Sequence, residues 1–324
     1  MKKINLLMHI PKYVDTQLSG GEATAKDFAE YLHSTGDYNV RVLVERANKI
    51  GLNNIPIYVE DLNNDNVNHL YRWANVIYTH LGSQGKAVNY ANNHKKPVFI
   101  YMHNTNGSAL ARSRKHIGVL YNSYFTKNIV GKDFEGNPNA LVRPLLNLDV
   151  TDVEGGEYVT LINLNENKGG LLLRQIAEEL PDVKFLAVTG GYAKQFTQQP
   201  SNVTVLPQQS NMLEVYKKTK ILIMPSTYES YGRTAAEALG HNIPVLYSNH
   251  NTALDEVVGN AGEPVNNRNN IASWVKGIRW IDNNIIHYRL RAKEQKEYLL
   301  MQINRDRVNF DAFIKNITFT ATKK

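Results

Sequence analysis

The stretch Met224-Pro225-Ser226-Thr227-Tyr228-Glu229-Ser230-Tyr231-Gly232-Arg233-Thr234-Ala235-Ala236-Glu237-Ala238-Leu239-Gly240 decides how this chain folds. An apolar run at residues 221–224 leads into it, which is typical of a parallel strand covered on both faces. Pro225 and Ser226 end that strand. The Ala-rich residues 234–239 favour a helix, and Gly240 followed by Pro244 ends it. The sequence therefore predicts a strand, a short turn and a helix start.

Such a helix start is a natural anion site, because its first N–H groups have no partner within the helix. Here the N–H groups of Gly232, Arg233 and Thr234 would point at a ligand above the strand, and Glu229 and Glu237 bracket them. Two carboxylates with amide donors between them suit a ligand with hydroxyls at both ends and phosphate in the middle, as in a nucleotide-sugar. Two solvated glutamates on a surface helix fit the spacing equally well, so the context must decide.

Length and composition indicate a globular protein with two domains. The chain has 324 residues, of which 42% are hydrophobic and 21% charged. No apolar run approaches the length that spans a bilayer. The N-terminal residues 4–10 are interpreted as a first strand, because the apolar run is short and no cleavage site follows it.

Cysteine and charge content limit the chemistry. The chain has no cysteine, which excludes disulfides, thiolate catalysis and Cys-ligated zinc and fits a reducing compartment. We expect a cytoplasmic location, with peripheral contact to an anionic inner membrane face as an option. The net charge of +7 suits donor phosphates, anionic lipid headgroups or nucleic acid, and it is equally compatible with ordinary solubility.

Strands alternate with helices along both halves of the chain, which predicts α/β units with parallel sheets. A polar linker at residues 151–157 follows a crossing segment, so the boundary is expected near residue 150. Two amphipathic helices, at residues 287–304 and 306–317, are expected at the C-terminus. Ligands of open α/β sheets bind at the carboxyl ends of the strands.

Four further positions stand at such strand ends. Gly21 lies in a Gly-Gly turn before the first helix, and His103 follows an apolar strand. Lys168 begins the first helix of the second half, and Gly190 belongs to a Gly-Gly pair after a strand. Each position also has an interpretation without function. Gly21 would lie in a tight turn, His103 would be a structural histidine, Lys168 a solvated lysine, and Gly190 part of a loop. No metal-ligand spacing involves His103.

The order of these pieces resembles the retaining glycosyltransferases of family 4, which have the GT-B fold. Residues 229–237 look like the family's E-x7-E motif, and residues 243–245 like its following Pro-Val segment. Asn167-Lys168-Gly169-Gly170, Gly20-Gly21 and Met102-His103-Asn104 also match. The resemblance covers most of the C-terminal half and only points of the N-terminal half. It implies two Rossmann-like domains facing across a cleft: an acceptor-side domain at 1–150, a nucleotide-sugar-binding domain at 151–304, and a helix at 305–324 that crosses back to the first domain.

The resemblance also implies residue roles. Glu229 would bind hydroxyls of the donor sugar, Glu237 the ribose, and Lys168 the diphosphate. His103 would contact the transferred sugar or the acceptor. The remaining donor-binding positions are the amides or side chains of Gly21, Asn163, Gly190, Tyr231, Gly232, Arg233 and Thr234.

One position departs from the family pattern. The family usually has an arginine five residues before the lysine, and this chain has Asn163 there. Losing a charged contact costs about 1.5–3 kcal/mol, which is a decade or more in rate. Arg233 and Arg143 are the cations considered as replacements.

We therefore expect a glycosyltransferase that moves a sugar, with retention, from a UDP- or GDP-sugar to a hydroxyl of a glycan or lipid-linked glycan precursor. No covalent nucleophile facing a base is evident, so positioning and charge stabilisation would dominate catalysis. No Asp-x-Asp motif is present, so no metal or other cofactor is expected.

Three alternatives stay open at this point. A viral type of DNA glucosyltransferase shares the fold and would suit the basic chain. A degenerate GT-B protein could bind nucleotide-sugar without turnover, which Asn163 would favour. Another GT-B enzyme, such as a nucleotide-sugar epimerase, would be separated by its products.

Overall fold

The computed structural model of the protein describes residues 3–13, 19–45, 54–60, 65–105, 117–153 and 155–321. The chain divides into two compact units, the first made of Met1–Leu145 with Ile303–Lys324 and the second of Leu146–Gln302. The division thus lies slightly earlier in the chain than the expected boundary near residue 150, and the returning segment begins at Ile303 instead of residue 305.

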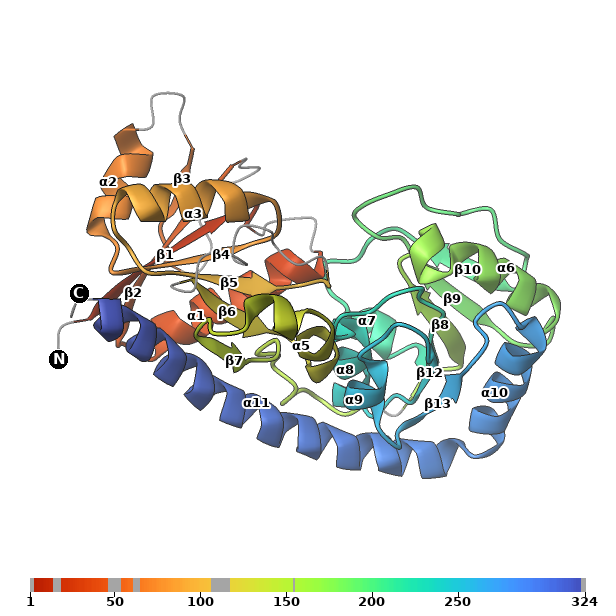
Figure 1. Ribbon diagram of the computed structural model, residues 1–324. Helices are drawn as coiled ribbons and strands as arrows, with labels where there is room; N and C mark the ends of the chain where they lie inside the picture. Colours follow the sequence, from red (N-terminus) through yellow and green to blue (C-terminus); the bar gives the residue numbers. More distant parts are fainter. Residues whose placement is uncertain are drawn as a thin grey trace. The chain divides into compact units, whose positions relative to one another are not determined.

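The first unit contains one parallel sheet of seven strands in the order β3-β2-β1-β4-β5-β6-β7 (Figure 1). Its strands are β1 (Ile4–Ile10), β2 (Tyr38–Val44), β3 (Ile57–Val59), β4 (Val76–His80), β5 (Val98–Met102), β6 (Gly118–Tyr121) and β7 (Asn139–Leu141). Its helices before the returning segment are α1 (Gly20–Ser34), α2 (Asp65–Trp73), α3 (Gln84–Asn93) and α5 (Tyr124–Val130), with 3₁₀ turns η1 (Leu81–Ser83) and η2 (Gly131–Phe134).

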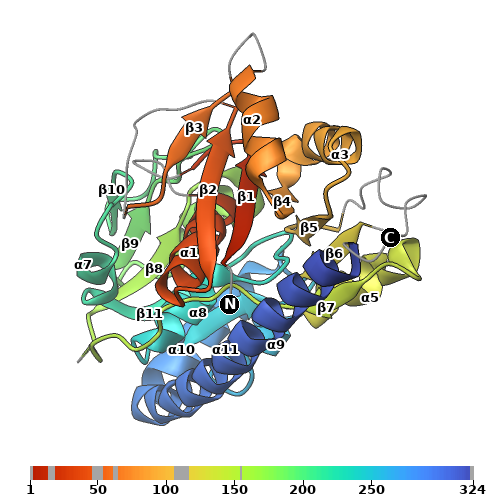
Figure 2. The ribbon, with the colours of Figure 1, turned by 90° about the vertical axis from the view of Figure 1, so that its left-hand side faces the viewer.

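Helices cover both faces of this sheet, with α2 and α3 on one face and α1 on the other (Figure 2). Leu7, Ile77 and Ile100 face the α2–α3 side, because side chains alternate between the faces of a strand. On the other face, Phe28 of α1 packs edge-on against Tyr101, with ring centroids 4.9 Å apart. Burial on both faces explains why these strands are continuous apolar runs in the sequence.

The second unit repeats the architecture with six parallel strands in the order β10-β9-β8-β11-β12-β13. Its strands are β8 (Tyr158–Ile162), β9 (Phe185–Val188), β10 (Val203–Leu206), β11 (Thr219–Met224), β12 (Val245–Ser248) and β13 (Gly262–Val265). Its helices are α6 (Gly170–Glu178), α7 (Leu213–Tyr216), α8 (Arg233–Gly240), α9 (Leu254–Val258) and α10 (Ile271–Asn283), and a 3₁₀ turn η3 (Glu166–Lys168) precedes α6.

The core of the second unit lies mainly between its sheet and two helices. Leu173 of α6 and Trp274 of α10 pack with Ile221 and Ile223 of the central strand β11. The opposite face is covered by α8 and α9, which pack against β11 and β12. Both units therefore confirm the predicted α/β fold with parallel sheets.

The C-terminal helix differs from the prediction. Residues 285–321 form one helix, α11 (Ile285–Ala321), where the sequence pattern indicated two. The helix has no Gly or Pro that would end it. Near the middle of the helix, Oδ2 of buried Asp306 accepts hydrogen bonds from the backbone N and from Nη1 of Arg143, at 3.0 and 2.8 Å.

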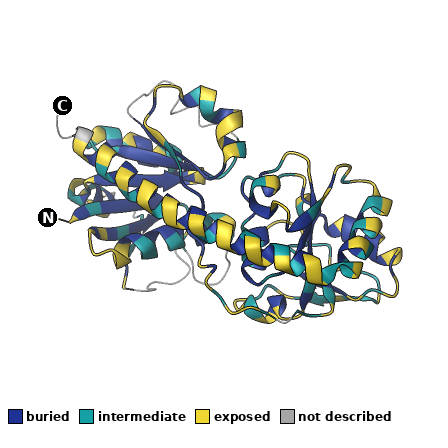
Figure 3. Cartoon of the chain, turned by 90° about the horizontal axis from the view of Figure 1, so that it is seen from below, coloured by how far each residue is buried: buried dark blue, intermediate teal, exposed yellow. Residues whose placement is uncertain are grey.

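Beyond Asp306, α11 packs into the first unit through a buried face. Phe310 of α11 lies against Phe28 of α1, with ring centroids 4.6 Å apart. Buried and exposed residues alternate along the helix up to residue 319, as the burial colours in Figure 3 show. From Ile303 onward, this helix belongs to the first compact unit. Among the described residues, no helix has both the length and the apolar character needed to cross a membrane.

Candidate nucleotide-sugar site

The candidate site of the second unit lies where the order of strands in its sheet reverses. The chain proceeds from β8 outward through β9 to β10, then returns to β11 beside β8 and continues through β12 to β13. The carboxyl ends of β8 and β11 therefore form a topological switch point, where open α/β sheets bind ligands. Lys168 follows β8 and Glu229 follows β11, so two residues 61 positions apart meet there.

The side chains of Lys168 and Glu229 form an ion pair. Ser226 donates a second hydrogen bond to the same Glu229 oxygen, Oε1, at 2.8 Å. Both partners are largely buried, with 22% of the Lys168 side chain and 12% of the Glu229 side chain exposed. Burial alone would lower the pKa of Lys168, but the Glu229 carboxylate outweighs it, so the pKa lies above its usual value. Lys168 therefore carries a fixed positive charge at this edge.

The two loops that carry these residues are held together by backbone contacts. The N–H of Thr227 donates to the carbonyl of Asn167 at 2.8 Å. Arg268 spans both loops, because its Nε donates to the carbonyl of Pro225 at 2.6 Å and its Nη2 to that of Glu166 at 3.1 Å. Sequence reasoning missed Ser226 and Arg268. Neither the hydrogen bond of Ser226 to the Glu229 carboxylate nor those of Arg268 to backbone carbonyls leave a sequence pattern.

The turn before α8 requires glycine at position 232. Gly232 has a φ of +94° and ends the turn as the N-cap of α8. A β-carbon there would also collide with the side chain of Leu254. The helix begins at Arg233, so Glu229 precedes it and the N–H groups at residues 232–234 belong to the predicted helix start. Tyr231 is buried, and Thr234 is half-buried.

Glu237 lies one turn into α8 with both carboxylate oxygens engaged. Oε1 accepts a hydrogen bond from Nε of Arg233 at 2.7 Å, and Oε2 accepts one from the hydroxyl of Tyr216 at 2.9 Å. Burial, followed by the Glu237 charge, raises the pKa of Tyr216 well above its usual value, so Tyr216 stays a donor. Glu237 is thus held in one orientation by a partner from α7 that the sequence did not suggest.

Asn163, at the position where the family has arginine, is built into a polar network. Its φ of +74° is left-handed, a conformation that asparagine tolerates better than most residues. Its Oδ1 accepts a hydrogen bond from Gln195 Nε2 at 3.1 Å, while Gln195 Oε1 accepts from the N–H of Gly190 at 2.8 Å. A β-carbon at Gly190 would collide with Asn163, so the predicted Asn163 and Gly190 do lie together.

The two cations considered as substitutes for the missing arginine have other partners. Arg143 belongs to the first unit, where it is buried and pairs with Asp306. Its charge is therefore already paired within that unit. Arg233 lies at the start of α8 and pairs with Glu237. Lys168 is the predicted site cation that the structure brings to the switch point beside Glu229.

The first unit brings His103 and Gly21 together at its own carboxyl edge. A β-carbon at Gly21 would lie 3.9 Å from Cε1 and Nε2 of His103 and 3.0 Å from Leu81. His103 follows β5, and its ring bonds to His80 at the end of β4. Sequence reasoning missed His80, although it also ends an apolar strand.

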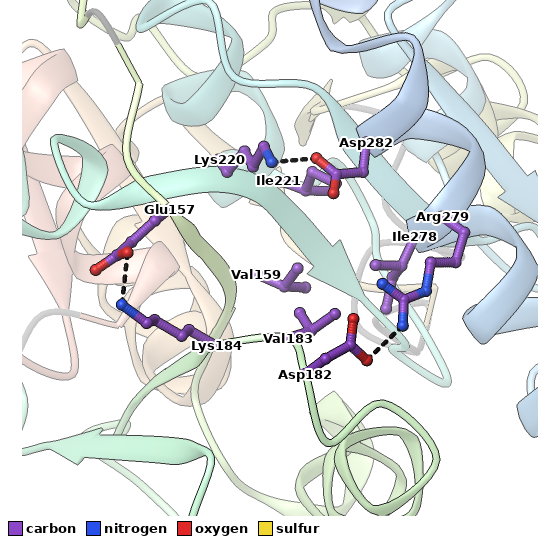
Figure 4. A pocket seen from close by; sticks show the side chains of 10 residues that line it. All are labelled: Glu157, Val159, Asp182, Val183, Lys184, Lys220, Ile221, Ile278, Arg279 and Asp282. Atoms are coloured by element: carbon purple, nitrogen blue, oxygen red, sulfur yellow. Dashed lines mark hydrogen bonds and ion pairs between the residues drawn. The ribbon is translucent and has the colours of Figure 1, made fainter.

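The cavity in Figure 4 lies at the opposite, amino-terminal edge of the second sheet. It measures about 220 Å³, and its lining residues include Val159, Val183, Ile221 and Ile278. Its charged groups are matched in pairs, Lys184 with Glu157, Arg279 with Asp182 and Lys220 with Asp282. These lining cations are thus neutralised, so the cavity does not resemble a phosphate site. Among the described residues, no group of three or more His, Asp or Glu could hold a metal ion.

Comparison with known proteins agrees with this geometry. Residues 164–297 match the family model described as glycosyl transferases group 1, a match that includes Lys168, Glu229 and Glu237. No curated protein sequence gives a significant match.

Solved structures share the fold along nearly the whole chain. A glycosyltransferase from Rickettsia africae is 16% identical, with a TM-score of 0.73, over 98% of this chain and 99% of that one. A sucrose-phosphate synthase from Thermosynechococcus elongatus is 12% identical, with a TM-score of 0.77, over 98% and 100%. HepE from Anabaena, solved with UDP-glucose, is 12% identical, with a TM-score of 0.76, over 98% and 100%.

These structural matches confirm the GT-B fold that the sequence predicted. The prediction of a glycosyltransferase is confirmed by the family match within the second unit. The finer assignment to family 4 is not part of that match. Residues 164–297, within the second unit, thus resemble the glycosyl transferases group 1.

Proposed function

We propose that the protein is a retaining glycosyltransferase that moves a sugar from a nucleotide-diphosphate donor to a hydroxyl of a glycan or lipid-linked glycan precursor. The observation that carries this proposal is the ion pair between Lys168 and Glu229. It lies at the switch point of a group 1 domain, directly before a helix start. A cation, a carboxylate and the N–H groups of a helix start are the groups that a nucleotide-sugar needs.

The donor roles follow from these positions. Lys168 would neutralise the diphosphate, assisted by the N–H groups at the start of α8, while Glu229 accepts hydrogen bonds from sugar hydroxyls. Glu237, oriented by Tyr216 and Arg233, would accept from the ribose. Asn163 would add a hydrogen bond without charge. HepE from Anabaena is described in complex with UDP-glucose, and a pneumococcal O-GlcNAc transferase with UDP and GlcNAc, so a UDP-sugar is the donor to test first.

Catalysis would depend on positioning and charge. The acceptor oxygen bonds to the anomeric carbon on the face that the diphosphate leaves, and the phosphate oxygen takes the acceptor's proton. The bond between the anomeric carbon and that oxygen breaks, so configuration is retained. Lys168 stabilises the negative charge that develops on the diphosphate. We expect the reaction to proceed without a metal ion, because this cation and the helix N–H groups supply the charge stabilisation.

The test is transfer or hydrolysis of UDP-glucose, UDP-GlcNAc and GDP-mannose, measured as release of UDP or GDP. We expect release from one donor class and a large loss in Glu229→Gln. Glu214→Gln is the matched control, because Glu214 is an exposed glutamate of the same unit that also pairs with a lysine. Full transfer by Glu229→Ala would overturn the site assignment.

A second candidate function is donor binding without turnover, and Asn163 favours it. The side chain that replaces the expected arginine is tied to Gln195 and carries no charge. Calorimetry would separate the two functions. Binding of UDP-glucose with no UDP release across an acceptor panel would favour the binding protein, and turnover would exclude it.

A further inference from the structure

Two histidines of the first unit share a hydrogen bond at the ends of neighbouring strands. His80 is the last residue of β4, and His103 directly follows β5, its partner in the sheet. Nδ1 of His80 lies 2.8 Å from Nε2 of His103, and the ring centroids are 4.8 Å apart at an interplanar angle of 62°. His80 is fully buried, whereas His103 is half-buried.

A hydrogen bond between two imidazoles needs a proton on one nitrogen and a lone pair on the other. If His103 were the donor, a neutral His80 would carry its own proton on Nε2. That nitrogen is buried and has no hydrogen-bond partner in the part of the chain that the structure describes. A buried N–H without an acceptor is rarer in folded proteins than a buried acceptor without a donor. The favoured arrangement therefore has Nδ1–H of His80 donating to Nε2 of His103.

The described groups around the pair are neutral. The hydroxyl oxygen of Tyr78 lies 3.5 Å from Nδ1 of His80, at the outer limit of a hydrogen bond, so it favours neither tautomer. The ring of Tyr101 lies edge-on to His103, with ring centroids 4.7 Å apart, and a β-carbon at Gly21 would lie 3.9 Å from the His103 ring. None of these groups is charged. Burial lowers the pKa of His103 to about 3, so the ring stays neutral across the physiological range.

We propose that His80 is a positioning residue that fixes His103 in the tautomer protonated on Nδ1, so that His103 donates a hydrogen bond to a sugar oxygen and does not act as a base. With Nε2 of His103 accepting from Nδ1–H of His80 across this 2.8 Å contact, the proton of a neutral His103 ring lies on Nδ1. A nitrogen that carries a proton cannot take another from the acceptor. The identity of the bound oxygen rests on the proposed function, whereas the tautomer does not.

The tautomer can be measured without any activity. ¹⁵N NMR of imidazole-labelled protein distinguishes a protonated nitrogen from one with a lone pair. We expect Nδ1 of His103 to be protonated in the unmodified chain. His80→Asn should keep this state, because an asparagine amide nitrogen can occupy the place of Nδ1, and His80→Leu should populate the Nε2–H form. A His103 ring protonated on Nε2 in the unmodified chain would overturn the proposal.

Kinetics supply the second readout. At saturating donor, we expect His80→Leu to lower kcat about tenfold and His80→Asn to retain more activity than His80→Leu. His103→Asn, which keeps a donor near the position of Nδ1, should be more active than His103→Asp, which offers only acceptors. His94→Asn is the control, since His94 is a histidine of the same unit that bonds to Asn68 away from this pair. Equal activity of His103→Asn and His103→Asp would count against the donor role.

The tautomer of His103 and the proposed transferase function can be refuted independently. Absence of transfer with every donor would refute the proposed function while the NMR result stands by itself. If His80→Leu does not fold, the NMR of the unmodified chain and the two His103 variants still decide the question.

Discussion

The two units use the same edge of the same kind of sheet for different chemistry. In the second unit, the carboxyl ends of β8 and β11 carry the charged pair Lys168–Glu229. In the first unit, the ends of β4 and β5 carry two imidazoles whose pKa values burial lowers, His80 and His103. A parallel sheet offers a place for side chains, and the residues placed there decide whether the site suits phosphate or neutral hydroxyls.

Loss of the Lys168 charge should have the largest effect on activity, because it removes the charge that distinguishes the second unit's site from the first unit's. We expect Lys168→Met to lower kcat by about 10²–10³, because the developing diphosphate charge loses its cation and Glu229 is left largely buried without its partner. Lys168→Arg should retain part of the activity. Lys217→Met is the control, as Lys217 is an exposed lysine paired with Glu214. A Lys168→Met enzyme within threefold of the unmodified one would contradict the role.

The first unit also contains a charged pair, Arg143–Asp306, and we expect its role to be structural. Removing one partner of a buried ion pair costs about 3–5 kcal/mol, and only 3% and 1% of these two side chains are exposed. Asp306→Ala should therefore lower the free energy of unfolding by that amount in urea titrations. Asp37→Ala, which removes an exposed partner of Lys315, should change it by less than about 1 kcal/mol. Equal losses of unfolding free energy in the two variants would show that the burial of the Arg143–Asp306 pair does not set its contribution to stability.

Substitution of Arg268 tests how the loops that carry the charged pair Lys168–Glu229 are held in position. Arg268→Gln loses the bridge between the carbonyls of Pro225 and Glu166, so the loops that carry Glu229 and Lys168 become less well positioned. We expect kcat/KM to fall about tenfold, since small misplacements of reacting groups are costly. Arg279→Gln, at the rim of the cavity in Figure 4, should leave kcat/KM unchanged. No loss in Arg268→Gln would mean that the backbone contact from Thr227 suffices.

The smallest expected effect is the pH dependence of the free energy of unfolding that arises from His103. The pKa of His103 is about 3 in the folded chain and near 6.5 when unfolded, so the unfolded chain binds more protons between these values. Stability should therefore rise with pH across that window and fall as pH drops below about 6.5. From pH 7 to 5.5, the free energy of unfolding should decrease by about 1 kcal/mol for this imidazole. His103→Asn should show a shallower slope in urea titrations at the two pH values, and an unchanged slope would refute the shift.

Much of the fold follows from local pattern. The predicted limits of β1, residues 4–10, match the structure, because this mostly apolar run has clear ends. The short edge strand β7 was missed, since residues 139–141 are only partly buried and lack that pattern. The helix predicted from Lys168 begins at Gly170, because Gly169 has a φ of +92° and separates it from the 3₁₀ turn η3.

Lys168, Glu229 and Glu237 could be recognised from the sequence because short motifs carry them. Their partners could not. These partners form hydrogen bonds, most of them to residues distant in the chain, and their local sequence gives no sign of such contacts. They are Ser226, Tyr216, Gln195, Arg268 and His80.

By itself, the sequence determined the parallel α/β class and the strand, turn and helix start around Glu229, because hydrophobic period and glycine positions are local properties. Only the tertiary structure decided that Lys168 meets Glu229, that Arg143 serves Asp306 and that His80 orients His103. Each of these pairings depends on which strands lie side by side and on how deeply a polar group is buried. Both are properties of the packed chain, and they set the charge and protonation of the site.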